Sequence, residues 1–176
     1  GTAGPDTIHV TPTTATSGFL SANGVGPTVS FSNLGTAAGN GVFTVSGGGN
    51  TGTIVVNGSA SSDSITVNRS ANTVSVNAFK VVHVVTEALT VAGQAGDDTI
   101  TVTGSGGPQL LVDGGTPSAS DDLIVVGTAG AANTFTVNSG TANDSGSVQL
   151  GGDVTQFLGI EGVTLNANGG GGADSA

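Results

Sequence analysis

The sequence contains no cysteine, tryptophan, tyrosine or methionine, and its only fixed cations are Arg69 and Lys80. Without cysteine there is no disulfide framework, thiolate metal site or cysteine nucleophile. Without tryptophan and tyrosine, the usual stacking platforms for nucleic-acid bases are missing. A net charge of −10 would also repel a phosphate backbone or an anionic membrane surface. We therefore expect no nucleic-acid partner, and no membrane insertion because no run of about 18 apolar residues is present.

Helix-forming residues are scarce as well, whereas glycine, valine and threonine are abundant. The 176 residues include 32 glycines and 23 valines but only 9 leucines. Valine, isoleucine, leucine and phenylalanine together make up 25% of the chain, which is above the level of roughly 20% below which chains stay disordered. The composition therefore predicts a folded, all-β protein with almost no helix.

Near-copies of one decamer recur along the chain. They are GTAGPDTIHV (1–10), GSASSDSITV (58–67), GQAGDDTITV (93–102), GTAGAANTFTV (127–137) and the partial copy SASDDLIVV (118–126). In each copy, apolar residues stand two and four positions after an Asp or Asn, which is the period of a strand with one buried face. The residues predicted to face the core are Ile8/Val10, Ile65/Val67, Ile100/Val102, Ile124/Val126 and Phe135/Val137.

Two architectures accommodate short strands separated by Gly, Asn, Asp and Ser turns. A parallel β-solenoid stacks such strands coil upon coil, and small glycine-rich corners let its backbone turn. The alternative is an antiparallel β-sandwich, which usually carries a large aromatic core residue and charged outer faces. We favour the solenoid, as a single repetitive domain over residues 1–176 with units of about 1–57, 58–126 and an incomplete 127–176.

The copy GQAGDDTIT resembles the hemolysin-type calcium-binding nonapeptide, G-G-x-G-x-D-x-hydrophobic-x. Gly93, Gly96 and Asp98 match, as does Ile100, while Gln94 stands where the motif has its second glycine. The whole chain resembles long, repetitive bacterial surface proteins with degenerate repeats of this RTX-like kind. The resemblance implies a secreted parallel β-solenoid that serves as a surface or matrix structure. The copies depart from a true calcium roll, because those at 58 and 93 are 35 residues apart rather than in direct tandem.

The aspartates of these turns are the candidate metal ligands. Calcium binds six to eight hard oxygens, and the residues that could contribute carboxylates are Asp6, Asp97, Asp98, Asp121, Asp122 and Asp174. The competing interpretation is that each Asp accepts backbone N–H groups at its turn and starts the strand. Asn133, an uncharged residue at the anchor position, favours that interpretation. The fold is expected to require no cofactor, with calcium as the one ion that the motif would hold.

The scarcity of basic groups and histidines predicts that the chain is not an enzyme. His9 and His83 are the only histidines, and Glu87 and Glu161 occupy matching places before strands, as structural residues of a repeat would. An acidic, lysine-poor chain suits the outside of a bacterium, because trypsin-like proteases find little to cut. Three N-x-S sequons, at Asn57, Asn68 and Asn143, would accept glycans there.

Two functions fit these features. The first is a structural extracellular protein, a solenoid building block of a self-associating filament, matrix or surface layer. The pattern is cut mid-repeat at both ends, which would favour head-to-tail addition of copies. The alternative is a calcium-dependent adhesin or carbohydrate-binding module.

Overall fold

The structure, a computed structural model, describes residues 6–22, 28–32, 43–46, 52–85, 88–116 and 120–168. All regular structure within these ranges is β. The strands are β1 (Thr7–Thr14), β2 (Ser17–Ala22), β3 (Val29–Phe31), β4 (Phe43–Ser46), β5 (Thr53–Asn57), β6 (Ser64–Asn68), β7 (Thr73–Val76), β8 (Phe79–Val85), β9 (Ala88–Ala92), β10 (Thr99–Thr103), β11 (Gln109–Asp113), β12 (Asp122–Val126), β13 (Phe135–Ser139), β14 (Gly146–Leu150), β15 (Asp153–Leu158) and β16 (Gly162–Asn166).

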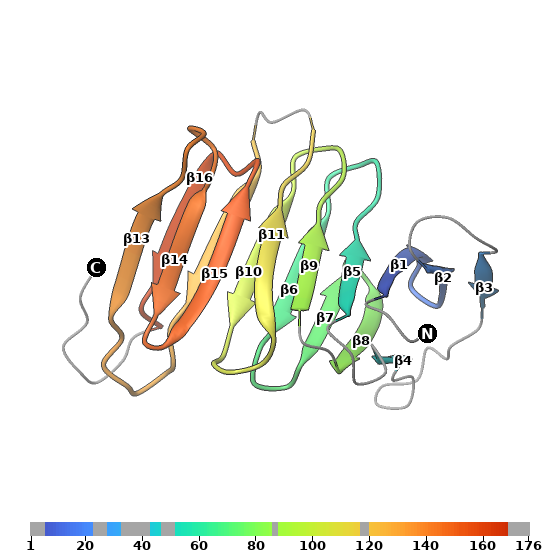
Figure 1. Ribbon diagram of the computed structural model, residues 1–176, viewed down its shortest axis with the longest axis horizontal. Helices are drawn as coiled ribbons and strands as arrows, with labels where there is room; N and C mark the ends of the chain where they lie inside the picture. Colours follow the sequence, from blue (N-terminus) through green and yellow to red (C-terminus); the bar gives the residue numbers. More distant parts are fainter. Residues whose placement is uncertain are drawn as a thin grey trace.

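The strands form two mixed sheets. The nine-stranded sheet has the order β13-β14-β15-β11-β9-β5-β1-β2-β3, and the seven-stranded sheet has the order β16-β12-β10-β6-β7-β8-β4. In Figure 1, β5, β9, β11 and β15 run side by side in the front layer, with β6 and β10 of the other sheet behind them. The prediction of an all-β protein is therefore confirmed.

The middle of each sheet is parallel, because the chain alternates between the two sheets as it advances. From β9 the chain crosses to β10, returns to β11 and crosses again to β12, so each circuit adds one strand to each sheet. The strands β5, β9, β11 and β15 pair in parallel, as do β6, β10, β12 and β16. Antiparallel meanders interrupt this pattern at β1-β2-β3, β6-β7-β8 and β13-β14-β15.

This topology makes neighbours of repeat copies that are distant in sequence. Ile65 of β6 lies beside Ile100 of β10, which lies beside Leu123 of β12. Between β6 and β10 the chain forms β7 and β8 in the same sheet and then β9 in the other sheet before it returns. Wide spacing in sequence therefore does not separate the copies in space.

One apolar core fills the space between the sheets. Ile54, Ile65 and Ile100 are fully buried, and Val10 and Val102 lie in the same cluster. Two predicted core pairs are wrong, at least in part. In β12 the buried residues are Leu123 and Val125 rather than Ile124 and Val126, and in β13 Phe135 is buried while Val137 is 51% exposed.

The error at β12 is a slip of one residue, which moves every side chain of a strand to the opposite face. The strand is anchored by Asp121 and not by Asp122, as the contacts below show. Val137 is exposed for a different reason, because β13 is the outermost described strand of its sheet.

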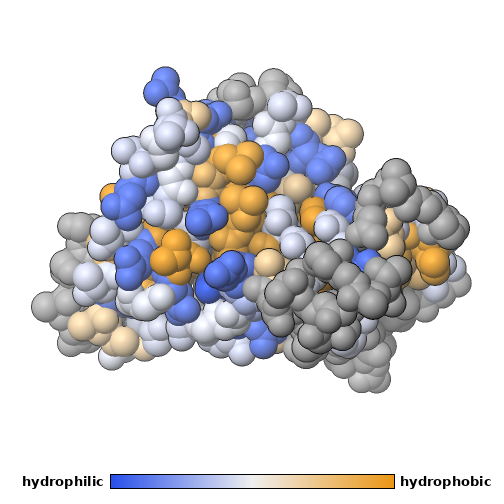
Figure 2. All heavy atoms as spheres, viewed as in Figure 1, coloured by the Kyte–Doolittle hydropathy of each residue, from blue (hydrophilic) through white to orange (hydrophobic). Residues whose placement is uncertain are grey.

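The outer face of the nine-stranded sheet is less polar than a solvated surface usually is. Figure 2 shows apolar residues gathered near the middle of this face. Val154 and Leu158 of β15 are 41% and 39% exposed. Across the described residues, no helix has the length and apolarity needed to cross a membrane. The assignment of a solenoid or a sandwich, and the division into three units, stay predictions.

Candidate functional site

Four acidic residues form a ladder at the corner where the chain enters the seven-stranded sheet. The backbone N–H of Asp63 donates to Asp98 Oδ1 at 2.8 Å, and that of Asp98 donates to Asp121 Oδ1 at 2.7 Å. The N–H of Asp121 in turn donates to Glu161 Oε2 at 2.8 Å. We name Asp63, Asp98, Asp121 and Glu161 the carboxylate ladder. The side chains of Asp98, Asp121 and Glu161 thereby each link their own circuit of the chain to the preceding one.

Glycines at the start of the same turns make room for the ladder. The N–H of Gly58 donates to the carbonyl of Ala92, and the N–H of Gly93 donates to that of Asp113. A Cβ on Gly93 would overlap both Asp98 Oδ2 and the carbonyl oxygen of Gly114. Glycine is required at this position by close approach, which explains why the repeat places a glycine five residues before its aspartate.

Gly114 plays the same part for the next carboxylate. A Cβ on Gly114 would overlap the carbonyl oxygen of Gly159 and would lie 2.7 Å from Asp121 Oδ2. In both turns, the Oδ2 atom of the aspartate and a backbone carbonyl oxygen therefore lie close to the position that a Cβ on the glycine would occupy.

Asp98 Oδ2 and Asp121 Oδ2 are buried without a hydrogen-bond partner among the described residues, and both side chains are 0% exposed. Burial raises the pKa of Asp98 to about 6, with further contributions from the nearby charges of Asp121, Asp63 and Asp97 and opposition from the N–H bond. Burial also raises the pKa of Asp121, and the charge of Glu161 adds to that effect. Neither carboxylate forms an ion pair with a described residue, and the buried Arg69 pairs instead with Asp153 at 3.6 Å.

Asp63, at the other end of the ladder, is fully partnered. Its Oδ2 accepts the N–H of Ser59 at 2.5 Å, and its Oδ1 accepts the Ser59 hydroxyl at 3.2 Å and the Asn77 side-chain amide. The same anchor position therefore works as a conventional turn aspartate where local donors are available.

Asn133 shows how an amide fills the anchor position in a copy on the other sheet. Its Oδ1 accepts the N–H of Thr128 at 2.8 Å, and its Nδ2 donates to the carbonyls of Thr128, Ala131 and Ala167 at 3.0 to 3.2 Å. A Cβ on Gly127 would lie 2.5 Å from this amide, so the pairing of glycine and anchor is kept. At this anchor position, therefore, Oδ1 of Asn133 accepts a hydrogen bond and Nδ2 donates hydrogen bonds.

The structure brings only two of the six candidate metal ligands, Asp98 and Asp121, into the ladder. Asp97 and Asp122 are exposed, and their side chains do not belong to it. Asp6 is buried but precedes β1 in the nine-stranded sheet, where its carbonyl accepts the N–H of Thr53. Asp174 lies outside the described residues. Within the described ranges, no three His, Asp or Glu side chains converge to hold a metal ion, and calcium binding stays a prediction.

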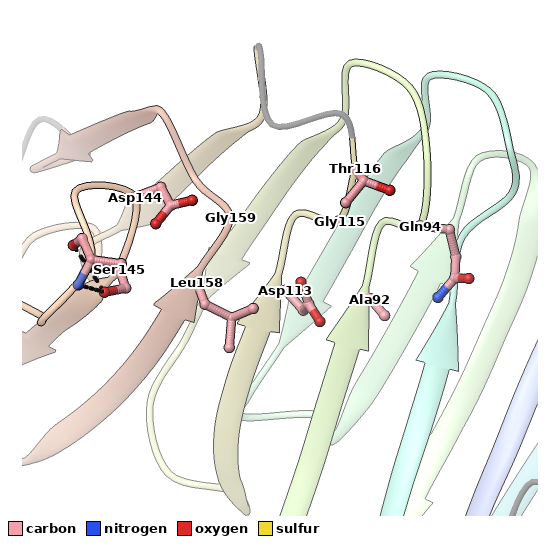
Figure 3. Close-up of a pocket in the computed structure, with 10 residues that line it drawn as sticks. Ala92, Gln94, Asp113, Gly115, Thr116, Asp144, Ser145, Leu158 and Gly159 are labelled. Atoms are coloured by element: carbon pink, nitrogen blue, oxygen red, sulfur yellow. Dashed lines mark hydrogen bonds between the residues drawn. The ribbon is translucent and has the colours of Figure 1, made fainter.

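The sequence reasoning missed two acidic residues that line a groove on the outer face. Asp113, the last residue of β11, and Asp144, in the β13–β14 loop, border a groove of about 510 Å³ (Figure 3). Burial raises the pKa of Asp113, against the effect of an N–H bond from Gly115. An Asp directly before Gly-Gly at the end of a strand is the signal that could have found Asp113. Asp144 lies near Asp113 only because of the way the chain folds, and no sequence pattern marks it.

The three sequons differ in accessibility. Asn143 is exposed in the β13–β14 loop. The amide of Asn57 donates to Thr11 Oγ1 at 2.9 Å, and Asn68 Oδ1 accepts the N–H of Ala71 at 3.0 Å. If glycans are attached, Asn143 is the position that is sterically ready for one.

Comparisons with protein-family models, with curated proteins and with solved structures found no match. The resemblance to RTX-like surface proteins therefore rests on the motifs alone and stays a prediction.

Proposed function

We propose that this chain is a structural protein, a β-solenoid building block of an extracellular filament, matrix or surface layer. The observation that carries the proposal is the repetition of the same contacts from circuit to circuit. Strands pair in parallel with strands one circuit away, corner glycines donate to the last carbonyl of the next strand, and ladder carboxylates accept the N–H of the preceding anchor residue. Units that contact only their nearest neighbours can be lengthened without redesign, which suits a spacer or scaffold.

Self-association is part of this proposal. In the described part of the chain β13 pairs only with β14, and Val137 on it is half-exposed. A strand edge with an apolar side chain is a template for a strand from another copy. The net charge of −10 opposes association, but salt screens charges beyond about 8 Å at physiological ionic strength. Assembly should therefore strengthen as salt concentration rises.

Electron microscopy and light scattering of the purified chain, with and without EGTA, test the proposal. We expect elongated assemblies that grow with salt and are unaffected by chelation. Val137→Lys should abolish them because it places a charge on the edge, whereas Thr66→Lys, on the exposed face of the central strand β6, should not. A chain that stays monomeric at all salt concentrations would contradict self-association.

A calcium-dependent adhesin is the second candidate, favoured by the two partnerless carboxyl oxygens of the ladder. A cation there would supply the positive charge that the site lacks. A monomer that melts much earlier in EGTA would replace the structural proposal with this one.

A further inference from the structure

The groove on the outer face lies where three neighbouring parallel strands end. Ala92 of β9, Asp113 of β11 and Leu158 of β15 occupy one register row across these strands and form its floor. Leu158 is 39% exposed, so the floor presents apolar surface beside a carboxylate. The β13–β14 loop forms one wall, with Asp144 on the side of the loop that faces Gly159 (Figure 3).

The loop that carries Asp144 is held in place by its own hydrogen bonds. The carbonyl of Asp144 accepts the N–H of Ile160 at 3.0 Å, and that of Ser145 accepts the N–H of Gly140 at 2.7 Å. The N–H of Ala142 donates to Ser145 Oγ at 3.1 Å. The Asp144 carboxylate, by contrast, makes no hydrogen bond or ion pair with any residue in the described ranges. The wall is therefore preorganised while its acidic group is free to bind a ligand.

The opposite margin of the groove contains a strained residue. Gln94 has a φ of 84°, a left-handed conformation that glycine adopts without cost. A Cβ on Gly115 would meet the Gln94 backbone, so the two corners are tightly packed. The side-chain amide of Gln94 donates to Asn57 Oδ1 at 3.2 Å and stays at the rim of the groove.

We propose that this groove binds an uncharged or amino sugar, with Asp113 and Asp144 accepting hydrogen bonds from its hydroxyl or ammonium groups and Leu158 contacting its C–H face. None of the described residues that line the groove is basic, which disfavours acidic sugars. Its volume lies within the range of about 300 to 1,000 Å³ that is typical of small-molecule sites. The lack of tryptophan and tyrosine makes the affinity weak, with a Kd of about 1 mM. This site goes beyond the proposed scaffold function and does not depend on it.

An NMR titration of the intact, isotope-labelled chain tests the proposal. The probes are the methyl glycosides of glucose, galactose, mannose and N-acetylglucosamine, together with glucosamine and glucuronate, all in EGTA. We expect at least one neutral or amino sugar to shift the amide signals of Gly115, Ser145 and Gly159, and glucuronate to shift none. Asp144→Asn should weaken binding about tenfold or more, because it removes a charged acceptor. Asp122→Asn, on the other sheet, should bind as the wild type does.

Three results would overturn the proposal. The first is the absence of shifts with every neutral and amino sugar. The second is unchanged affinity in a folded Asp144→Asn variant. The third is that calcium alone shifts the same amides and that sugars shift them only when calcium is present, which would make the groove a cation site. The dispersion of the amide spectrum shows whether the Asp144→Asn variant has folded.

Discussion

The protein should become more stable as the pH falls from about 7.5 to about 4.5. Asp98 has a pKa of about 6 in the folded chain, against an ordinary value of 3.8. Between these two values the folded state binds more protons than the unfolded state, so protons favour folding. The contribution is fully present below the unfolded pKa and is lost as the pH rises through about 6. Most proteins show the opposite trend, because their carboxylates are stabilised in the ionised form.

The size of this effect follows from the shift at Asp98. One pKa unit corresponds to about 1.4 kcal/mol, so the shift from 3.8 to about 6 corresponds to roughly 3 kcal/mol over the whole titration of Asp98, of which about 2 kcal/mol develops between about pH 7.5 and pH 4.5. The raised pKa values of Asp121 and Asp113 act in the same direction. For a chain of this length, about 2 kcal/mol raises the melting temperature by about 4 to 8 °C.

Urea unfolding at a series of pH values measures the effect. Asp98→Asn should remove most of the pH dependence attributed to that residue, because an amide keeps the shape of the side chain and does not titrate. The exposed neighbour Asp122→Asn is the matched control and should retain the wild-type slope. A free energy of unfolding that stays level or falls between about pH 7 and pH 4.5 would refute the reasoning. So would a wild-type slope in Asp98→Asn.

Three further substitutions test the packing. Arg69→Ala should cost about 3 to 5 kcal/mol in urea unfolding, because Arg69 is 6% exposed and its guanidinium donates to three carbonyls; an unchanged midpoint would contradict this. Gly93→Ala should destabilise the fold by about 3 kcal/mol or more through overlap with the ladder, whereas Gly152→Ala, which meets open space, should change the melting temperature little. Gln94→Gly should raise the free energy of unfolding by about 0.5 to 1 kcal/mol, because relief of about 1 to 2 kcal/mol of left-handed strain exceeds the entropic cost of glycine. The control is Gln94→Ala, which keeps the Cβ and should not raise the free energy of unfolding.

The local pattern of the chain was enough to predict strands and most of the core. Period-two alternation identified Ile65/Val67 and Ile100/Val102 correctly, because burial of one strand face requires that period. It failed at the partial copy, where two successive aspartates allow two registers. Choosing between Asp121 and Asp122 requires knowing which N–H lies one circuit away, and only the three-dimensional pairing supplies that.

Contacts between circuits were beyond the reach of sequence reasoning. The 35-residue spacing of the copies argued against their meeting, yet β6 and β10 pair directly, since β7 and β8 extend the sheet on the other side of β6 and only β9 lies in the other sheet. Glu161 belongs to no decamer copy, but its longer side chain reaches the N–H of Asp121. Asp113 and Asp144 meet at the groove only because the β13–β14 loop folds back over the strand ends.

Asn133 and Asp98 together indicate what the anchor position requires. At Asn133 one side-chain atom accepts an N–H and the other donates to carbonyls, and an amide supplies both functions at every pH. At Asp98 the first function is met by Oδ1, while Oδ2 lies beside a carbonyl oxygen across Gly93. A carboxyl group can donate at that point only when it is protonated. A protonated carboxyl group therefore offers the same pair of functions as an amide, whereas an ionised Asp98 leaves Oδ2 buried without a hydrogen-bond partner among the described residues.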